Sequence, residues 1–263
     1  MDLQNHKADF DTNGVKLFAI SYDSVASLGI FSDGYDIDFP LLSDVDSKVI
    51  QNFGIRNKLI RPEETEYYGI PFPGAYLVDE AGKVIAKFFN QQHQVRESAL
   101  SMLRMGFEVP VKPINPNCVE VSDAGVTVRA SLVTRELYPW QRSLLYVDLQ
   151  LDDGLHIYGD PIPDGYIKTE VVTTGTEGLL FGEPQFPPTK PFKIEGIQEY
   201  FHTFDGNVEI VVPVMSTINE TNSAEIELTV SFQACTHEMC YLPRSERLHI
   251  ELTTLPNVKR IDD

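Results

Sequence analysis

The 263-residue sequence has few cysteines and no long apolar run. Because no run of roughly 18 apolar residues occurs, we expect no segment that spans a bilayer. Only three cysteines are present, Cys118, Cys235 and Cys240, which is too few for a disulfide-stapled scaffold of this length. The count favours one functional or structural pair and one bystander.

Basic residues are also scarce. The chain has 21 Lys and Arg against 39 Asp and Glu, which gives a net charge of −18. Such a field repels phosphate backbones and anionic lipid heads, so we expect no binding of nucleic acids or membrane surfaces. We interpret the acidic charge as a contribution to solubility.

The N-terminus lacks the basic start and apolar middle of a secretory signal, because Met1 to Asp11 is polar and acidic. This absence favours a cytoplasmic location. If the N-terminus is truncated, a signal could have been lost with it, and an extracytoplasmic location stays open. The pattern of the first hundred residues bears on this question.

Those residues alternate strand and helix signals. Val15–Ile20 and Ala75–Val78 are short apolar runs typical of buried strands, and Val84–Phe89 follows a tight turn as a hairpin partner. Asp46–Phe53 and Val95–Leu103 carry helical patterns. We expect an α/β domain with a mixed sheet.

Prolines recur every third residue between Val109 and Pro116, which suits an extended, semi-rigid linker. We therefore place a first domain at residues 1–108, a linker at 109–116 and a second domain at 117–257. In the second domain, apolar and polar residues alternate in five segments, 126–132, 145–151, 208–214, 226–232 and 248–252. Several half-buried antiparallel strands of this kind predict a β-sandwich.

The pair Cys235 and Cys240 follows directly on one of these strands, and Pro243 lies three residues beyond the second cysteine. Residues 235–240 are therefore expected to form a hairpin tip, where two Cα atoms can approach the roughly 5.5 Å that a disulfide needs. Cross-linking so short a loop removes little entropy from the unfolded chain, so the bridge adds little stability. The spacing alone leaves a redox pair and a static bridge equally open.

Zinc is a third reading of these cysteines. A structural zinc site needs about four ligands, and only His237 lies close in sequence to the two thiolates. We expect no metal and no cofactor. His237 would lower a thiol pKa if protonated, although we favour a solvent-facing loop position for it.

Residues 116–255 resemble the N-terminal domain of the thiol:disulfide interchange protein DsbD, the disulfide bond corrector family. The resemblance is carried by three segments in the family's order: Asp153–Tyr158, Tyr200–Pro213, and Phe232–Pro243 with both cysteines. It implies an immunoglobulin-like sandwich whose cysteine pair, on a hairpin, cycles between dithiol and disulfide. Thioredoxin-fold proteins would be the electron donor and acceptor.

Carried over residue by residue, the resemblance implies that Cys235 and Cys240 are the redox pair and that a partner thiolate attacks Cys240. Phe204 would be the cap side chain that shields the disulfide, and His156 and Tyr158 would line the site. His156 departs from the family, because some members carry another aromatic residue there. The alternatives are packing roles for Tyr158 and Phe204 and a structural hydrogen bond for His156.

Residues 15–103 resemble the AhpC/TSA, or peroxiredoxin-like, branch of the thioredoxin fold. The matching segments are Val15–Asp23, Phe39–Asp44, Phe53–Ile55 and Pro73–Gly82. The resemblance implies an incomplete thioredoxin-like domain in which Pro73 follows a cis peptide bond and faces the family's reactive cysteine.

That cysteine is missing from this chain, since none precedes Cys118. The family's first strand and catalytic cysteine come before a helix that is reduced here to about Leu3 to Phe10, so we interpret the domain as truncated. We expect no peroxidase activity from this chain.

Two functions of different class remain. The first is a thiol–disulfide exchange protein, derived from a redoxin fusion, that uses Cys235 and Cys240 with thioredoxin-fold partners. The second is a non-catalytic interaction module in which the same cysteines form a structural disulfide. The reduction potential of the pair separates the two, because structural bridges lie below about −300 mV.

Overall fold

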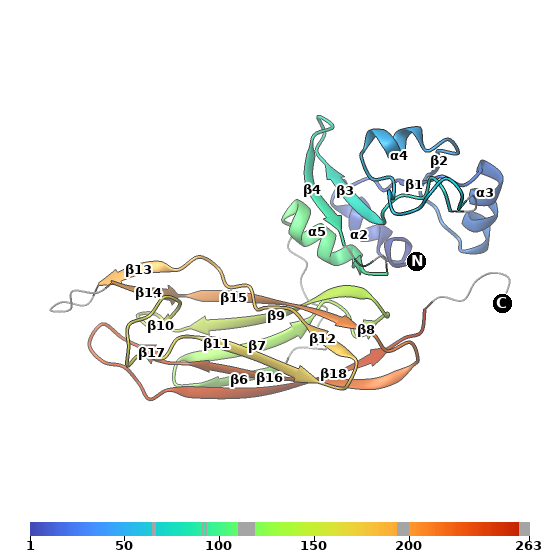
Figure 1. Ribbon diagram of the computed structural model, residues 1–263. Coiled ribbons are helices and arrows are strands. Elements are labelled where there is room, and N and C mark those ends of the chain that lie inside the picture. Colours follow the sequence, from blue (N-terminus) through green and yellow to red (C-terminus); the bar gives the residue numbers. More distant parts are fainter. Residues whose placement is uncertain (65–66, 91, 93, 110–118, 194–199, 258–263) are drawn as a thin grey trace. The chain divides into compact units, whose positions relative to one another are not determined.

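The structure is a computed structural model that describes residues 1–64, 67–90, 92, 94–109, 119–193 and 200–257. The chain divides into two compact units, residues 1–111 with 258–263 (unit 1) and residues 112–257 (unit 2) (Figure 1). Most of the expected linker, residues 109–116, lies outside the described residues. None of the described helices is long and apolar enough to cross a membrane.

Unit 1 alternates short helices and strands. In chain order its elements are α1 (Asp2–Asn5), α2 (Lys7–Thr12), β1 (Ala19–Ser21), α3 (Val25–Gly34), β2 (Leu41–Ser43), α4 (Lys48–Asn52), β3 (Gly74–Val78), β4 (Val84–Phe89), β5 (Arg96–Glu97) and α5 (Ala99–Phe107). The strands within 75–78 and 84–89 are confirmed, and the predicted strand over Val15–Ile20 begins only at Ala19.

The strands of unit 1 do not form the single mixed sheet that the sequence predicted. β1 pairs with β2 in parallel and β3 pairs with β4 antiparallel, and these are two separate sheets in the described part of the chain. Large apolar side chains, including Phe18, Val25 and Ile30, are exposed in this unit. Two isolated strand pairs bury little apolar surface, since independent stability normally needs three or more strands with a covered face.

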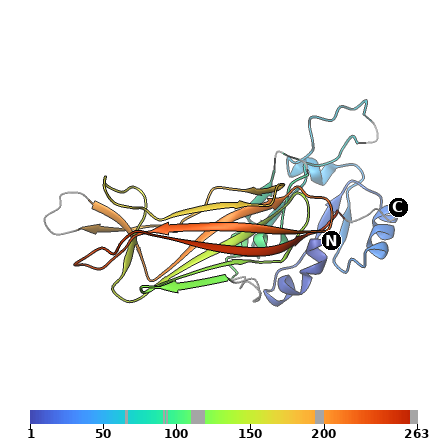
Figure 2. The same ribbon diagram turned by 90° about the horizontal axis from the view of Figure 1, so that it is seen from below.

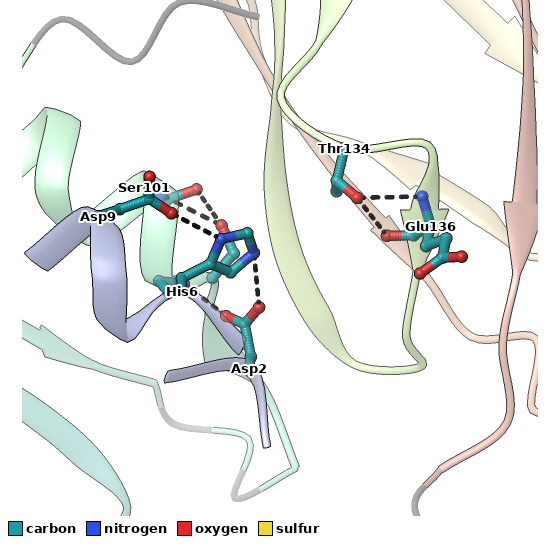
Figure 3. A network of polar contacts seen from close by, with 8 residues as sticks. Asp2, His6, Asp9, Ser101, Thr134 and Glu136 are labelled. Carbon is teal, nitrogen blue, oxygen red and sulfur yellow. Dashed lines mark hydrogen bonds and ion pairs between the residues drawn. The ribbon is translucent and has the colours of Figure 1, made fainter. Parts of the chain in front are cut away.

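Side-chain caps fix two helices of unit 1. The Ser98 hydroxyl accepts a hydrogen bond from the Ser101 amide at the start of α5, as Ser24 does for α3. Asp2 accepts from the Ala99 amide at 2.5 Å and pairs with His6, which also contacts Asp9 at 3.1 Å (Figure 3). This network anchors the N-terminal helices to the first turn of α5.

Unit 2 is built of strands. They are β6 (Val119–Asp123), β7 (Val126–Leu132), β8 (Glu136–Leu137), β9 (Gln141–Leu151), β10 (His156–Tyr158), β11 (Glu170–Gly175), β12 (Leu179–Phe181), β13 (Lys190–Lys193), β14 (Tyr200–Asp205), β15 (Asn207–Ser216), β16 (Asn222–Phe232), β17 (Ala234–Cys235) and β18 (Arg244–Thr254). All five alternating segments predicted from the sequence fall within strands.

The large sheets of unit 2 face one another. One has the strand order β12-β15-β9-β7-β6 and the other β11-β16-β18-β8. The paired strands β16 and β18, orange and red in Figure 2, lie side by side along the unit. Val128, Val147, Ile210, Ile226 and Ile250 belong to one buried core cluster to which both sheets contribute. The alternation of apolar and polar residues therefore produces a sandwich with one apolar core.

A third, small sheet carries the cysteine pair. Its strand order is β13-β14-β10-β17, with every neighbouring pair antiparallel. Three of its strands have four residues or fewer. It is this small sheet that brings segments around residues 157, 192, 201 and 235 together.

Candidate functional site

The cysteines lie on a tight hairpin tip that the local sequence stabilises. The Thr236 amide donates to the Met239 carbonyl at 2.8 Å, and the Tyr241 amide donates to Ala234 at 2.9 Å. The Thr236 hydroxyl oxygen also accepts from the amides of Glu238 and Met239, each at 3.1 Å. Threonine favours such turns through these side-chain bonds.

Cys235 and Cys240 form a disulfide across this hairpin, with their Cα atoms 4.0 Å apart. The prediction that the pair is within disulfide reach is confirmed. In this state neither sulfur is a free thiolate that could bind a metal. Cys118 lies outside the described residues, so its predicted separation from the pair stays a prediction.

The two cysteines differ in exposure. Cys235 is fully buried, with 0% of its surface accessible, whereas Cys240 is exposed on the hairpin tip. Met239 and Tyr241, which flank Cys240, are 56% and 39% exposed. An incoming group therefore reaches the Cys240 side of the disulfide more easily.

Strand register decides which side chains share a face with Cys235. His156 on β10 is the Cα partner of Cys235 on β17. Tyr158 on β10 pairs with Thr203 on β14, and Phe201 on β14 pairs with Phe192 on β13. Because side chains alternate between faces, these residues lie on one face of the small sheet. We call this the disulfide face, defined by Cys235, His156, Tyr158, Phe192 and Phe201.

Phe204 does not lie on the disulfide face. It is the register partner of Ile157, which in turn pairs with Ala234, and all three belong to the sandwich core. Phe204 stacks on Phe186 with ring centroids 6.1 Å apart and lines a hollow of about 460 Å³ to which neither cysteine contributes. This corrects the expectation that Phe204 caps the disulfide. Side chains along a strand alternate between the two faces of the sheet, and Phe204 lies on the face opposite the disulfide.

Besides Tyr158, the aromatic neighbours of Cys235 are Phe201, Phe192 and Tyr166, which the sequence did not single out. Phe201 and Tyr158 form a buried cluster with Cys235, against which the half-buried Phe192 and Tyr166 pack. The Tyr166 ring meets those of Tyr158 and Phe201 edge-on. The sequence alone could not have found Phe201, because its face follows from the register in which Thr203 pairs with Tyr158.

Tyr158 contacts the exposed side of the disulfide. Its hydroxyl donates to the Cys240 Sγ at 3.5 Å. Burial, the main cause, together with the neighbouring Tyr166, raises the pKa of Tyr158 above its usual value. The hydroxyl therefore remains protonated and a donor at neutral pH.

His156 is the second titratable group on the disulfide face. Its ring lies 4.5 Å from that of Phe192 and 6.3 Å from that of His237. Burial and then His237 lower the pKa of His156, while Asp205 opposes the shift. The imidazole is therefore neutral near pH 7.

Pro73 of unit 1 also departs from expectation. It directly precedes strand β3 as predicted, but the Phe72–Pro73 bond is trans, since Asp160–Pro161 is the cis bond among the described residues. The trans form is intrinsically preferred before proline. β3 pairs only with β4 in the described chain, so no neighbouring strand with a cysteine faces Pro73.

One further group of metal-type ligands occurs in the described residues. Glu225, His249 and Glu251 place ligand atoms within 4.8 Å of one another on β16 and β18. All three side chains are exposed, and His249 already pairs with Glu225 at 3.7 Å. Nothing in their surroundings distinguishes them from an ordinary charged strand surface.

Comparisons with known proteins agree with this division of the chain. The AhpC/TSA family model matches residues 1–87, and the model of the thiol:disulfide interchange protein DsbD, N-terminal, matches residues 128–252. The chain thus has a two-domain architecture that combines these two types. The description of the second model, a thiol:disulfide interchange protein, agrees with the disulfide that unit 2 carries.

Curated relatives match about a third of the chain. A putative peroxiredoxin of Mycobacterium tuberculosis is 32% identical over 93 residues, which are 34% of this chain and 55% of the relative. A putative peroxiredoxin of Haemophilus influenzae is 28% identical over 90 residues, 33% of this chain and 54% of the relative. The chain spans about half the length of the curated relatives it matches.

Solved structures with a likeness include the N-terminal periplasmic domain of ScsB from Proteus mirabilis, with 14% identity and a TM-score of 0.36 over 50% of this chain and 49% of that one. The reduced DsbD N-terminal domain of Neisseria meningitidis has 17% identity and a TM-score of 0.28 over 40% and 74%. The complex of the DsbD and PilB N-terminal domains from Neisseria meningitidis has 16% identity and a TM-score of 0.29 over 44% and 81%.

Proposed function

We propose that this chain is a thiol–disulfide exchange protein that passes electrons between thioredoxin-fold partners through Cys235 and Cys240. The observation that carries the proposal is the unequal exposure of the two cysteines, one buried and one at an exposed hairpin tip. Exchange proceeds by attack of a thiolate on one sulfur, and access decides which sulfur is attacked. Cys240 is therefore the point of attack.

The exchange has two steps. A partner thiolate attacks the Cys240 Sγ, the Cys235–Cys240 bond breaks, and its electron pair leaves on the Cys235 Sγ. A second thiolate of the partner then attacks its own sulfur in the mixed disulfide and releases Cys240 as a thiolate. The two partner cysteines become a disulfide. Cys235 and Cys240 become thiolates, which take up two protons to give the dithiol.

The hairpin does not depend on the bridge for its shape. Backbone hydrogen bonds already close it on both sides of the turn, from Thr236 to Met239 and from Tyr241 to Ala234. A bridge with a sequence separation of 5 stabilises by only about 2 kcal/mol in the chain-entropy model, compared with ~4.7 kcal/mol for a 100-residue loop. These points favour exchange chemistry over the alternative of an interaction module with a static bridge.

The surroundings of Cys240 suit a docking partner. The attacked residue follows Met239 and precedes Tyr241 and Leu242, and all three of these side chains are exposed. Exposed apolar side chains around a reactive atom provide contact area that excludes water when a partner docks. We place the thioredoxin-fold partner on this tip.

Unit 1 is, in this proposal, a thioredoxin-like domain of the AhpC/TSA type without peroxide chemistry of its own. Residues 1–117 contain no cysteine, and attack on peroxide requires a nucleophilic thiolate. Thiol–disulfide exchange by this chain therefore takes place in unit 2.

The test is reduction of the oxidised full chain by a reduced thioredoxin-fold protein, followed by thiol labelling. Two free thiols should appear at Cys235 and Cys240. Cys240→Ser should abolish the transfer, while the matched control Cys118→Ser should leave its rate unchanged. A reduction potential below about −300 mV, with no reduction by any thioredoxin-fold donor, would instead establish the static bridge.

A further inference from the structure

His156 has an unexplained polar atom on the disulfide face. The residue is only 6% exposed, and its Nε2 has no hydrogen-bond partner among the described residues. Buried polar side-chain atoms in native proteins nearly always have a partner. The structural hydrogen bond considered from the sequence is therefore not found at this nitrogen, and a role that appears in another state of the site would account for it.

The position of the ring relates it to Cys235. His156 and Cys235 are Cα partners in the antiparallel pair β10–β17, so their Cβ atoms are about 5 Å apart on the same face. The ring is held by Phe192 at 4.5 Å and by the edge of Tyr158 at 5.5 Å between centroids. Cys240, in contrast, receives the Tyr158 hydroxyl. Tyr158 thus contacts the Cys240 sulfur, and His156 is the polar residue in register with Cys235.

We propose that His156 is a catalytic hydrogen-bond donor that stabilises the Cys235 thiolate released when a partner attacks Cys240. This inference rests on the proposed function and assigns a role to a residue at its site. In the oxidised state the sulfur of Cys235 is bonded to Cys240 and carries no charge, which leaves the Nε2 hydrogen unused. Breaking that bond creates a charged acceptor on the neighbouring strand, at the residue that pairs with His156.

The step balances without transfer of a proton from His156. The partner sulfur bonds to the Cys240 Sγ, the electron pair of the old bond moves to the Cys235 Sγ, and the neutral imidazole donates its Nε2 hydrogen to the new thiolate. Water later supplies the proton that converts the thiolate to a thiol. The partner sulfur is oxidised and Cys235 is reduced.

The charged groups around His156 allow this role near neutral pH. His237 faces it from the hairpin, and Asp205, its register partner on β14, carries an ion pair with Lys190 of β13. Burial keeps the pKa of His156 low, so the ring is a neutral donor. A neutral tautomer with hydrogen on Nε2 can donate to a thiolate and leaves no buried positive charge in the oxidised state.

The test uses the full chain in a Cys118→Ser, Cys240→Ser background, where Cys235 is the titrating thiol. His156→Phe keeps a ring and removes the donor, and His156→Gln restores an N–H without a titratable group. In the Phe variant the Cys235 thiol pKa should rise by about one unit, a tenfold loss of thiolate at a given pH, as expected for losing a hydrogen bond to a charged sulfur. Gln should recover part of that loss.

The same substitutions in the wild-type cysteine background provide a kinetic readout. Reduction of the disulfide by dithiothreitol should slow about tenfold in His156→Phe and less in His156→Gln. An unchanged thiol pKa and an unchanged rate in the Phe variant would overturn the inference and leave Cys240-directed exchange intact. Failure of every thioredoxin-fold donor to reduce the wild-type chain would instead remove the proposed function.

A measurement on unsubstituted His156 covers the case in which the Phe variant does not fold. Nitrogen-15 NMR of the imidazole should show a proton on Nε2 in both redox states and a changed Nε2 shift once the Cys235 thiol ionises. An Nε2 shift that does not follow this ionisation would contradict the inference.

Discussion

At the residue scale, position on a strand matters more than residue type. Phe201 and Phe204 are both aromatic, both nearly fully buried and only three residues apart on β14. Parity separates them, because Phe201 packs with Cys235 and Phe204 with the sandwich core. A sequence motif identifies the segment but cannot assign its faces until the register with β10 is known.

His156 should make the stability of the oxidised protein depend on pH. Burial lowers its pKa in the folded state, so the unfolded chain binds a proton near pH 6.5 that the folded chain does not. The contribution of His156 to stability is therefore fully present above the unfolded pKa and is lost as the pH falls from the unfolded pKa through the lower folded pKa.

Denaturant unfolding of the wild-type chain and of His156→Phe between pH 7.5 and 5.5 measures this contribution. The free energy of unfolding of the wild type should fall more steeply with decreasing pH, by at most about 1.4 kcal/mol per pH unit for one proton. Equal slopes in the two proteins would show that His156 titrates alike in both states.

At the element scale, elements with a clear apolar pattern were predictable and the others were not. The strands β7, β9, β15, β16 and β18 follow a period of two over seven or more residues, which the sequence displays directly. Helix α3 was missed because it buries no residue and so shows no apolar face. The small sheet was missed because its strands are short and come from distant segments.

The two faces of the small sheet predict different effects of truncating Phe204 on β14 and Phe192 on β13. Phe204→Ala should cost about 3–5 kcal/mol of stability, as large-to-small core substitutions do, without changing the rate at which a small thiol reduces the folded protein. Phe192→Ala, on the disulfide face, should speed that reduction because Phe192 packs against the cluster around Cys235.

Denaturant unfolding and reduction by dithiothreitol under native conditions give both values. If Phe204→Ala does not fold, Phe204→Leu provides the same comparison at a smaller cost in stability. Faster reduction in the Phe204 variant than in the Phe192 variant would restore Phe204 as the shield of the disulfide.

At the scale of the whole molecule, the cysteines are concentrated in one unit. Unit 1 resembles peroxiredoxins over residues 1–87, yet residues 1–117 contain no cysteine. The sequence predicted both resemblances and the cysteine pair. It could not predict the unequal burial of Cys235 and Cys240, which arises because Cys235 lies on β17, paired with β10, whereas residues 237–240 of the turn are exposed.

The identity of the attacked sulfur tests this account most directly. The oxidised chain is mixed with a thioredoxin whose resolving cysteine is replaced by serine, and the mixed disulfide is trapped by acid. Cleavage after Glu238 separates the two cysteines into different peptides for mass spectrometry. We expect the thioredoxin peptide on Cys240, the exposed residue, with Cys235 as a free thiol. A thioredoxin peptide bonded to Cys235 would contradict the account.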